Sequence, residues 1–179
     1  VGCYGAGTGA SVGKLTGFEH AMKSGAGYAE IILADGLAVG AYMAVNACGE
    51  IYDQDKILAG ALADDDRTII SSHRLMLEGY ERNMGGNTSI GCIITNADLT
   101  KTECRMVSTM AHDGLARSIR PVHTSMDGDT LFTMASGEVK TTIDTVGYLA
   151  EEAVRLAVLD AAASAEGMGG RPAYRDIIK

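Results

Sequence analysis

The strongest periodic pattern in the chain predicts a helix over about residues 100–120. Its apolar residues recur at spacings of three and four, so they form a stripe that is expected to meet a core; they are Cys104, Val107, Ala111, Leu115 and Ile119. Thr100 and Glu103 have the spacing of a capping box at its start, and Pro121 follows its last turn. A second helix with a wide apolar face is predicted over about residues 145–165.

Shorter stretches rich in β-branched and alternating residues predict the strands of a sheet. Residues 29–34 and 37–46 flank Asp35-Gly36, a pair typical of a tight hairpin turn. Further strands are predicted at residues 50–52, 89–95 and 130–135. Strands that alternate with one-sided helices indicate a layered α/β fold, in which both helices pack on one face of the sheet.

Residues 53–87 are polar and irregular, and their pattern predicts only a short helix near residues 72–81. This segment is either a solvated excursion or a loop that presents the residues after it. Residues 171–179 form a short tail that is available to dock on a neighbouring molecule.

The composition of the chain limits which kinds of molecule it is expected to bind. The chain has 179 residues, 46% of them hydrophobic, which suits one globular domain. A formal net charge of −8 argues against a nucleic acid or an anionic membrane as partner. No apolar run is long enough to span a membrane and no signal peptide is visible.

The cysteines and histidines are widely scattered. Without a CxxC pair the cysteines are interpreted as reduced core residues of a cytoplasmic protein; they are Cys3, Cys48, Cys92 and Cys104. The histidines form no pattern of metal ligands, and neither a metal nor a cofactor is predicted; they are His20, His73, His112 and His123.

The residues before the strand at 89–95 carry the most distinctive chemistry. Gly85, Gly86 and Asn87 form a loose turn that leads into Thr88. The threonine hydroxyl is placed to attack the carbonyl before it, in an N→O acyl shift, and hydrolysis of the resulting ester would leave Thr88 as a new N-terminus. A free α-amine beside its own hydroxyl makes threonine a competent nucleophile. The alternative interpretation is that these residues form an ordinary turn without chemical function.

Two carboxylates precede the strand at residues 130–135. Asp127 and Asp129 bracket Gly128, and with an alternating pattern they fall on the same face. Two carboxylates on one face are expected to share a proton, which would supply an acid–base pair for the first attack by Thr88. The alternative interpretation is a plain turn, because the spacing does not fit an EF-hand calcium loop.

Residues 1–13 are rich in glycine and lead to Lys14. A Walker A loop fails at both ends, because Thr8 and Leu15 occupy the positions that need glycine and Ser or Thr. A dinucleotide-binding loop needs a strand before it and a helix after it. That strand, if there is one, would lie outside the chain. The alternative interpretation is a loop whose glycines let backbone segments approach closely and hold Lys14 at a rigid place.

Five segments together resemble a known family: residues 5–14 (GAGTGASVGK), 44–46 (AVN), 86–90 (GNTSI), 111–116 (AHDGLA) and 123–132 (HTSMDGDTLF). The chain resembles the L-aminopeptidase/D-esterase (DmpA-like) family of N-terminal nucleophile hydrolases, which includes β-aminopeptidases and 6-aminohexanoate-oligomer (nylon oligomer) hydrolases. The resemblance covers nearly the whole chain. Asn87 before a threonine and the Asp-Gly-Asp motif are closer to the nylon-oligomer branch.

The resemblance implies a layered αββα-type sandwich of the kind found in DmpA and ornithine acetyltransferase. It implies one self-processing hydrolase domain, of which residues 1–179 are the C-terminal part and an upstream segment is missing. Autocleavage between Asn87 and Thr88 would make residues 1–87 the end of the larger subunit and 88–179 the smaller one. In such an enzyme Asn46 would donate its side-chain amide to the developing oxyanion, and Lys14 would favour the nucleophilic form of the Thr88 amine–hydroxyl pair.

The same resemblance implies small peptide or amide substrates and assembly into a homo-oligomer. Nothing in the sequence distinguishes L-peptides, D-alanine amides, β-peptides and nylon oligomers as substrates. Two alternatives from other classes stay open: a nucleotide- or phosphate-binding module built on residues 5–14, and a non-catalytic subunit.

Overall fold

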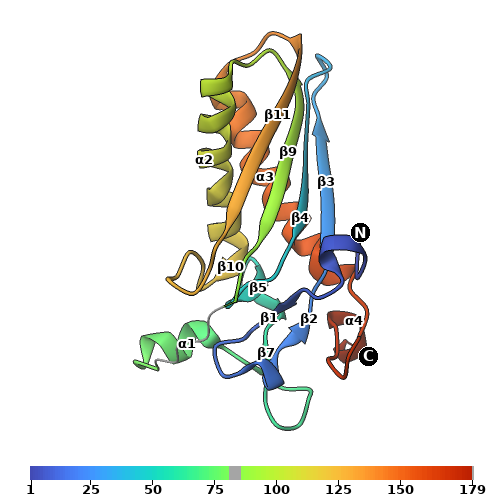
Figure 1. The fold of residues 1–179 in the computed structure, drawn as a ribbon, viewed down its shortest axis with the longest axis vertical. Helices are drawn as coiled ribbons and strands as arrows, with labels where there is room; N and C mark the ends of the chain where they lie inside the picture. Colours follow the sequence, from blue (N-terminus) through green and yellow to red (C-terminus); the bar gives the residue numbers. More distant parts are fainter. Residues whose placement is uncertain (81–85, 179) are drawn as a thin grey trace.

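The main sheet of the protein has four strands, in the order β11-β9-β4-β3 (Figure 1). The computed structural model describes residues 1–80 and 86–178. The strands are β3 (Ala26–Ile32), β4 (Ala38–Ala44), β9 (Ile90–Ala97) and β11 (Thr130–Val139). Strands β3, β4 and β9 pair antiparallel, whereas β9 and β11 pair parallel. A parallel pair needs a crossover connection, and α2 (Lys101–Ser118) supplies it.

Both long helices cover the same face of this sheet (Figure 1). Helix α3 (Ile143–Ala163) packs on β3 and β4, and α2 packs on β11 and on α3. The predicted capping box of α2 is formed by Thr100 and Glu103, and the stripe residues Val107, Ala111 and Leu115 are fully buried. The expected layered α/β arrangement, with both helices on one face, is therefore confirmed.

Among the described residues, shorter strands form three small sheets near one end of the main sheet (Figure 1). Strand β5 lies between β6 and β10, β1 pairs with β2, and β7 pairs with β8. Their bounds are β1 Ser11–Val12, β2 Met22–Lys23, β5 Glu50–Asp53, β6 Lys56–Ala59, β7 Ala61–Leu62, β8 Ile69–Ile70 and β10 Ile119–Arg120. Helices α1 (Ser72–Leu77) and α4 (Tyr174–Ile177) and short 3-10 turns at Gly5–Gly7 and Phe18–His20 complete the described elements. None of the described helices is both long enough and apolar enough to cross a membrane.

Four expectations from the sequence need correction. Residues 53–80 are not simply irregular, because they contain β6, β7, β8 and α1; strands of two to four residues are too short to show a periodicity. The final strand continues past residue 135 to Val139, through a break in register. The tail after residue 170 docks on its own chain, since Ala173 is buried and α4 packs against the core. Helix α1 ends at Leu77, earlier than the predicted helix at 72–81, whose last residue lies outside the described residues.

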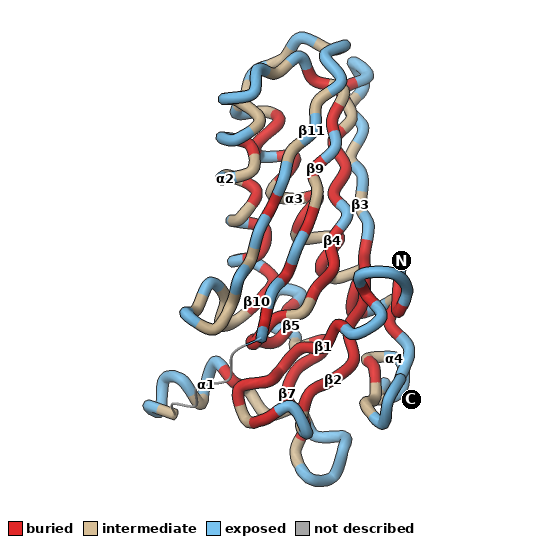
Figure 2. Tube along the Cα trace, in the orientation of Figure 1, coloured by how far each residue is buried: buried red, intermediate tan, exposed pale blue. Residues whose placement is uncertain are grey.

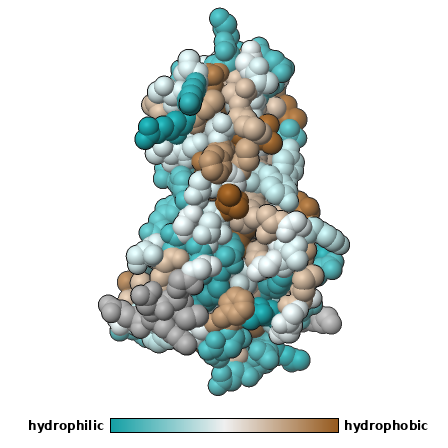
Figure 3. Space-filling model, viewed as in Figure 1, coloured by the Kyte–Doolittle hydropathy of each residue, from teal (hydrophilic) through white to brown (hydrophobic). Residues whose placement is uncertain are grey.

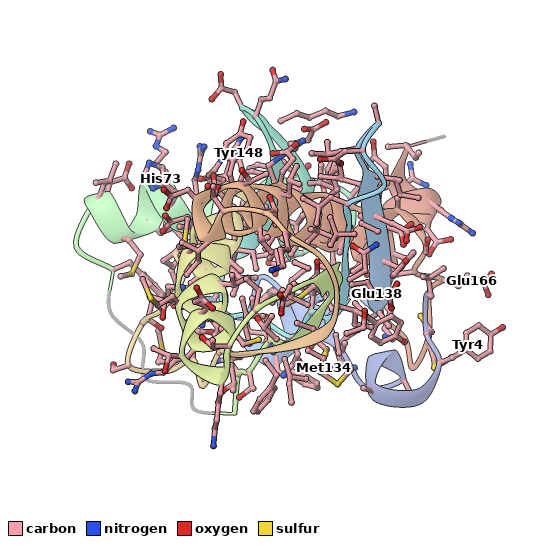
Figure 4. The ribbon with its side chains drawn as sticks, turned by 90° about the horizontal axis from the view of Figure 1, so that it is seen from above. Tyr4, His73, Met134, Glu138, Tyr148 and Glu166 are labelled. Atoms are coloured by element: carbon pink, nitrogen blue, oxygen red, sulfur yellow. The ribbon has the colours of Figure 1, made fainter. Side chains whose placement is uncertain are left out.

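The opposite face of the main sheet is apolar and open. Along β9, buried residues alternate with exposed or half-buried ones (Figure 2), as expected when successive side chains point to opposite faces. Large apolar side chains on the exposed face are Tyr28, Tyr42, Ile90, Ile94, Phe132 and Met134. Apolar side chains gather over the upper part of the molecule in the space-filling view (Figure 3). Met134 projects from the side of the molecule opposite Tyr148 of α3 (Figure 4). The described residues thus cover only one face of this sheet.

Gly27 of β3 sets how closely helix α3 approaches the sheet. A Cβ atom at this position would lie 2.0 Å from the carbonyl oxygen of Ala157 and 2.4 Å from the amide nitrogen of Ala161. Both atoms belong to the helix backbone, which cannot give way as a flexible side chain can. The absence of a side chain at Gly27 therefore permits direct packing of strand and helix.

We expect Gly27→Ala to lower the free energy of unfolding by about 1–3 kcal/mol, because the added methyl group forces the helix off the sheet. Gly9→Ala is the matched control, since a Cβ atom at Gly9 meets nothing within 4 Å. Urea denaturation of the two variants measures the difference. Equal stability of both variants would contradict the close approach of α3 to β3.

Candidate active site

Residues 87–89 lie at the end of the main sheet and are held by backbone hydrogen bonds from both sides. The Thr88 amide donates to the carbonyl oxygen of Asn46, which follows β4, at 2.9 Å. On the other side Asn87 pairs with Asp127 in a parallel bridge, and the Thr130 amide donates to Ser89 O at 3.0 Å. The segment before β9 is thereby fixed between the ends of β4 and β11.

The side chain of Thr88 lies against the peptide bond that precedes it. Thr88 is exposed, whereas Asn87 is 4% exposed. The hydroxyl Oγ1 of Thr88 donates to the carbonyl oxygen of Asn87 at 2.5 Å. The same oxygen accepts the Gly128 amide at 2.9 Å. The hydroxyl is therefore next to the carbonyl group that the sequence analysis marked for attack.

Lys14 and Asn46 form a hydrogen-bonded pair beside Thr88. The Lys14 ammonium Nζ lies 2.7 Å from Asn46 Oδ1 and 3.4 Å from the Asn46 carbonyl oxygen, which also accepts the Thr88 amide. Lys14 is 4% exposed, and burial lowers its pKa to about 8, against smaller opposing effects of Cys48 and Asp127. A buried amine with this pKa is partly neutral near physiological pH and has the capacity to accept a proton.

The amide of Asn46 is fixed in orientation by three partners. Its Oδ1 accepts Lys14 Nζ and the Ser11 amide at 3.2 Å, and its Nδ2 donates to the Gly86 carbonyl oxygen at 3.4 Å. The sequence analysis expects this amide to donate to an oxyanion. In the uncut chain Nδ2 donates to the Gly86 carbonyl, one residue before the Asn87 carbonyl that the Thr88 hydroxyl contacts.

The two aspartates have separate sets of donors. Asp127 accepts the Cys48 amide at 3.1 Å through Oδ1 and the Thr124 hydroxyl at 2.7 Å through Oδ2. Asp129 accepts the Ser89 amide at 2.8 Å through Oδ1, and its Oδ2 lies 3.0 Å from Nδ1 of His123. The hydrogen bonds of the described residues therefore tie each carboxylate to backbone and neighbours rather than to the other carboxylate.

Two histidines that the sequence analysis left without a role extend this network. His123 has a left-handed backbone conformation with φ of 54°, which is uncommon for a residue other than glycine. Its Nε2 lies 3.2 Å from Nδ1 of His112 on α2. Burial, followed by the nearby His123 ring, lowers the pKa of His112 below its ordinary value. The chain His112–His123–Asp129 thus links helix α2 to the segment of Thr88. The eleven-residue separation of the histidines, one on a helix and one on a loop, gave no sequence signal for this contact.

The glycine-rich loop does not have the form of a dinucleotide-binding loop. Its Ser11–Val12 segment is followed by strand β2 and a 3-10 turn, not by the helix that such a loop requires. Carbonyl oxygens of Gly7 and Ala10 accept hydrogen bonds from the buried Lys23 ammonium at 3.1 and 2.8 Å. The loop therefore packs around an internal cation and holds Lys14 beside Asn46.

Sequence comparisons connect this arrangement to known proteins. A family model described as peptidase family S58 matches residues 1–175. The chain is 35% identical over 195 residues to an uncharacterised aminopeptidase of Mycobacterium leprae (strain TN), covering 97% of this chain and 52% of that protein. It is 31% identical over 148 residues to a 6-aminohexanoate-oligomer endohydrolase of Kocuria sp. (strain KY2), covering 77% of this chain and 40% of that protein. The chain spans about half the length of these relatives.

Solved structures share the fold. An L-aminopeptidase D-Ala-esterase/amidase from Ochrobactrum anthropi, described as a variant of the Ntn hydrolase fold, superposes with a TM-score of 0.64 at 19% identity, covering 96% of this chain and 47% of that one. A β-aminopeptidase from Burkholderia sp. gives a TM-score of 0.62 at 22% identity, with coverage of 96% and 49%. The fold class expected from the sequence is confirmed, and this chain corresponds to about half of such a structure.

We expect the Lys14 amine to lose its proton with a midpoint near pH 8, because burial disfavours its charged form. A titration followed by NMR of the labelled lysine side chains measures the midpoint in a Thr88→Ala variant, in which the hydroxyl nucleophile is absent. Lys14→Arg identifies the signal by removing it. Since the neutral amine is the form that accepts protons, steps that use it as a base should accelerate as pH rises through about 8. A midpoint at the ordinary value of 10.5 would rule out this role at neutral pH.

Proposed function

The chain belongs to peptidase family S58, and from that premise we propose that it is part of a self-cleaving N-terminal-nucleophile amidohydrolase, an aminopeptidase that acts on small peptides or amides. Thr88 is the proposed nucleophile, first against Asn87 and then against substrate. The observation that carries the proposal is the contact between the Thr88 hydroxyl and the Asn87 carbonyl, beside the buried Lys14–Asn46 pair.

In the proposed cleavage, Thr88 Oγ1 forms a bond to the carbonyl carbon of Asn87 and gives its proton to a nearby base. The tetrahedral intermediate collapses as the bond from that carbon to the Thr88 nitrogen breaks, and the proton passes to the leaving nitrogen. Water then hydrolyses the ester, leaving a carboxylate on Asn87 and restoring the Thr88 hydroxyl. Asp127, Asp129 and Lys14 are the proposed proton-transfer groups, and general acid–base help of this kind contributes about 10²–10⁴-fold in rate.

After cleavage the new α-amine of Thr88 would act with its own hydroxyl on substrate amides. Lys14 supports this role because its cationic form would disfavour a second positive charge close by and so favour the unprotonated α-amine of Thr88. Asn46, already oriented by Lys14 and Ser11, is the proposed donor to the oxyanion of the substrate. The acyl-enzyme would be a threonine ester that water opens.

The sheet supports the proposal that residues 1–87 and 88–179 stay together once cut. Strand β9 of the second piece pairs with β4 of the first over six residue pairs. Helix α3 of the second piece packs on β3 and β4 of the first. Cleavage before β9 would therefore leave one continuous sheet. Because the relatives are about twice as long, the complete substrate pocket is proposed to include residues outside this chain.

We expect Thr88→Ala, made in the complete gene product, to remain a single uncut chain without amidase activity. Thr88→Ser should still cut, since serine retains the hydroxyl. Intact-mass measurement detects the fragment that begins at residue 88. Thr109→Ala, a remote exposed threonine on α2, is the matched control and should cut normally. Normal cutting of Thr88→Ala would falsify the mechanism.

The carboxylates are tested separately. We expect at least one of Asp127→Ala and Asp129→Ala to slow cleavage by about a hundredfold or more, because each removes a potential proton-transfer group. A time course on a denaturing gel measures the rate, with Asp113→Ala on the exposed side of α2 as a control. If both variants cleave themselves and hydrolyse substrate at normal rates, the aspartates have no part in the mechanism. The proposed role of Thr88 as nucleophile would still stand.

A further inference from the structure

We propose that the backbone amide of Gly128 is the donor that stabilises the oxyanion formed at Asn87 during self-cleavage. This inference rests on the proposed function, which requires attack on the Asn87 carbonyl. The step concerns the moment at which Thr88 Oγ1 bonds to the carbonyl carbon. The π electrons of the carbonyl group then move onto its oxygen, which becomes negatively charged until collapse re-forms the double bond and expels the Thr88 nitrogen.

The first support is the distance. The Gly128 nitrogen lies 2.9 Å from the Asn87 carbonyl oxygen. Donors effective in stabilising an oxyanion lie about 2.7–3.1 Å from the position that the oxyanion occupies, and the Gly128 amide already contacts this oxygen before the attack. The attacking hydroxyl Oγ1 contacts the same oxygen, so nucleophile and donor converge on one carbonyl group. Asn87 is buried, and burial strengthens a hydrogen bond to a developing charge.

The second support is the rigidity of the loop that carries this amide. Asp127, just before Gly128, is held by the Cys48 amide and by Thr124. Asp129, just after it, is held by the Ser89 amide. The glycine is thus clamped on one side to the segment after β4 and on the other to the strand of the nucleophile. A donor that is already in place needs no reorganisation when charge develops.

The third support is the space that glycine leaves. A Cβ atom at Gly128 would lie 2.8 Å from Thr88 Oγ1 and 3.8 Å from the Asn87 carbonyl oxygen. Any other residue would therefore press on the attacking hydroxyl. The absence of a side chain lets the backbone amide and the hydroxyl approach the carbonyl together.

The other candidate donor is engaged elsewhere in the uncut chain. Asn46 Nδ2 donates to Gly86 O, and Asn46 Oδ1 is held by Lys14 and Ser11. The two donors therefore divide between the two reactions: Gly128 serves the cut at Asn87, and Asn46 is available for later substrate carbonyls.

An amide-to-ester exchange tests the inference, because glycolate in place of Gly128 removes the N–H group and adds no side chain. The complete protein is assembled by semisynthesis and refolded, and the fraction cut is followed by intact mass. Glycolate in place of Gly36 is the matched control, since that amide also donates to a backbone carbonyl, Leu33 O at 3.0 Å, in the remote β3–β4 turn. We expect the Gly128 ester to cut about 10²–10³-fold more slowly than the control.

The outcomes separate the two proposals. If the control protein cuts at residue 88 and the Gly128 ester cuts equally fast, this inference is overturned while the proposed function stands. If neither the control nor the unmodified protein cuts, the proposed function itself fails.

If the Gly128 ester does not fold, a second measurement tests the hydrogen bond from the Gly128 amide to the Asn87 carbonyl. Isotope-edited infrared spectroscopy of the Asn87 carbonyl, in an uncut Thr88→Ala variant that lacks the hydroxyl donor, reports the remaining hydrogen bond. A carbonyl frequency lowered to that of a bonded amide supports the Gly128 contact. The frequency of an unbonded carbonyl would overturn it.

Discussion

The backbone pairing of residues 87–89 is the constraint on which the candidate site depends. The Thr88 amide is bonded to the carbonyl of Asn46, and the carbonyls of Asn87 and Ser89 are bonded to the amides of Gly128 and Thr130. These bonds continue the ladders of β4 and β11 beyond the ends of the regular strands. Because β4, β9 and β11 meet there, backbone hydrogen bonds hold the exposed Thr88 hydroxyl next to the Asn87 carbonyl.

Burial gives the same place its chemical character. The Lys14 ammonium is removed from water, and its hydrogen bonds are made to the oxygens of a neutral residue, Asn46. Desolvation outweighs the attraction of Asp127, so the amine approaches neutrality near pH 8. The aspartates differ, since backbone amides and a hydroxyl already satisfy their oxygens. The site thus combines a buried amine that is partly neutral near pH 8 with carboxylates whose hydrogen bonds also fix the loop around Gly128.

A protein cut before residue 88 would keep its sheet. Strand β9 is internal to the sheet, and its ladders with β4 and β11 do not depend on the covalent bond before it. The described residues leave one apolar face of the sheet exposed, and the chain spans about half the length of its relatives.

Local patterns in the sequence determined the long helices, the capping box at Thr100, the hairpin at Asp35-Gly36 and the Asn-Thr pair, because each depends on residues a few positions apart. The family followed from five short segments in order. What only the tertiary structure decided is which atoms meet. Short strands in residues 53–80 escaped prediction because two to four residues are too few to show a periodicity. The contact of His112 with His123 and the position of the Gly128 amide also escaped prediction. The sharing of a proton by Asp127 and Asp129 stays a prediction; what the structure adds is that the backbone amides of Cys48 and Ser89 donate to these carboxylates. Such contacts arise where segments separated by 40 or 79 residues pack together, and no local periodicity encodes them.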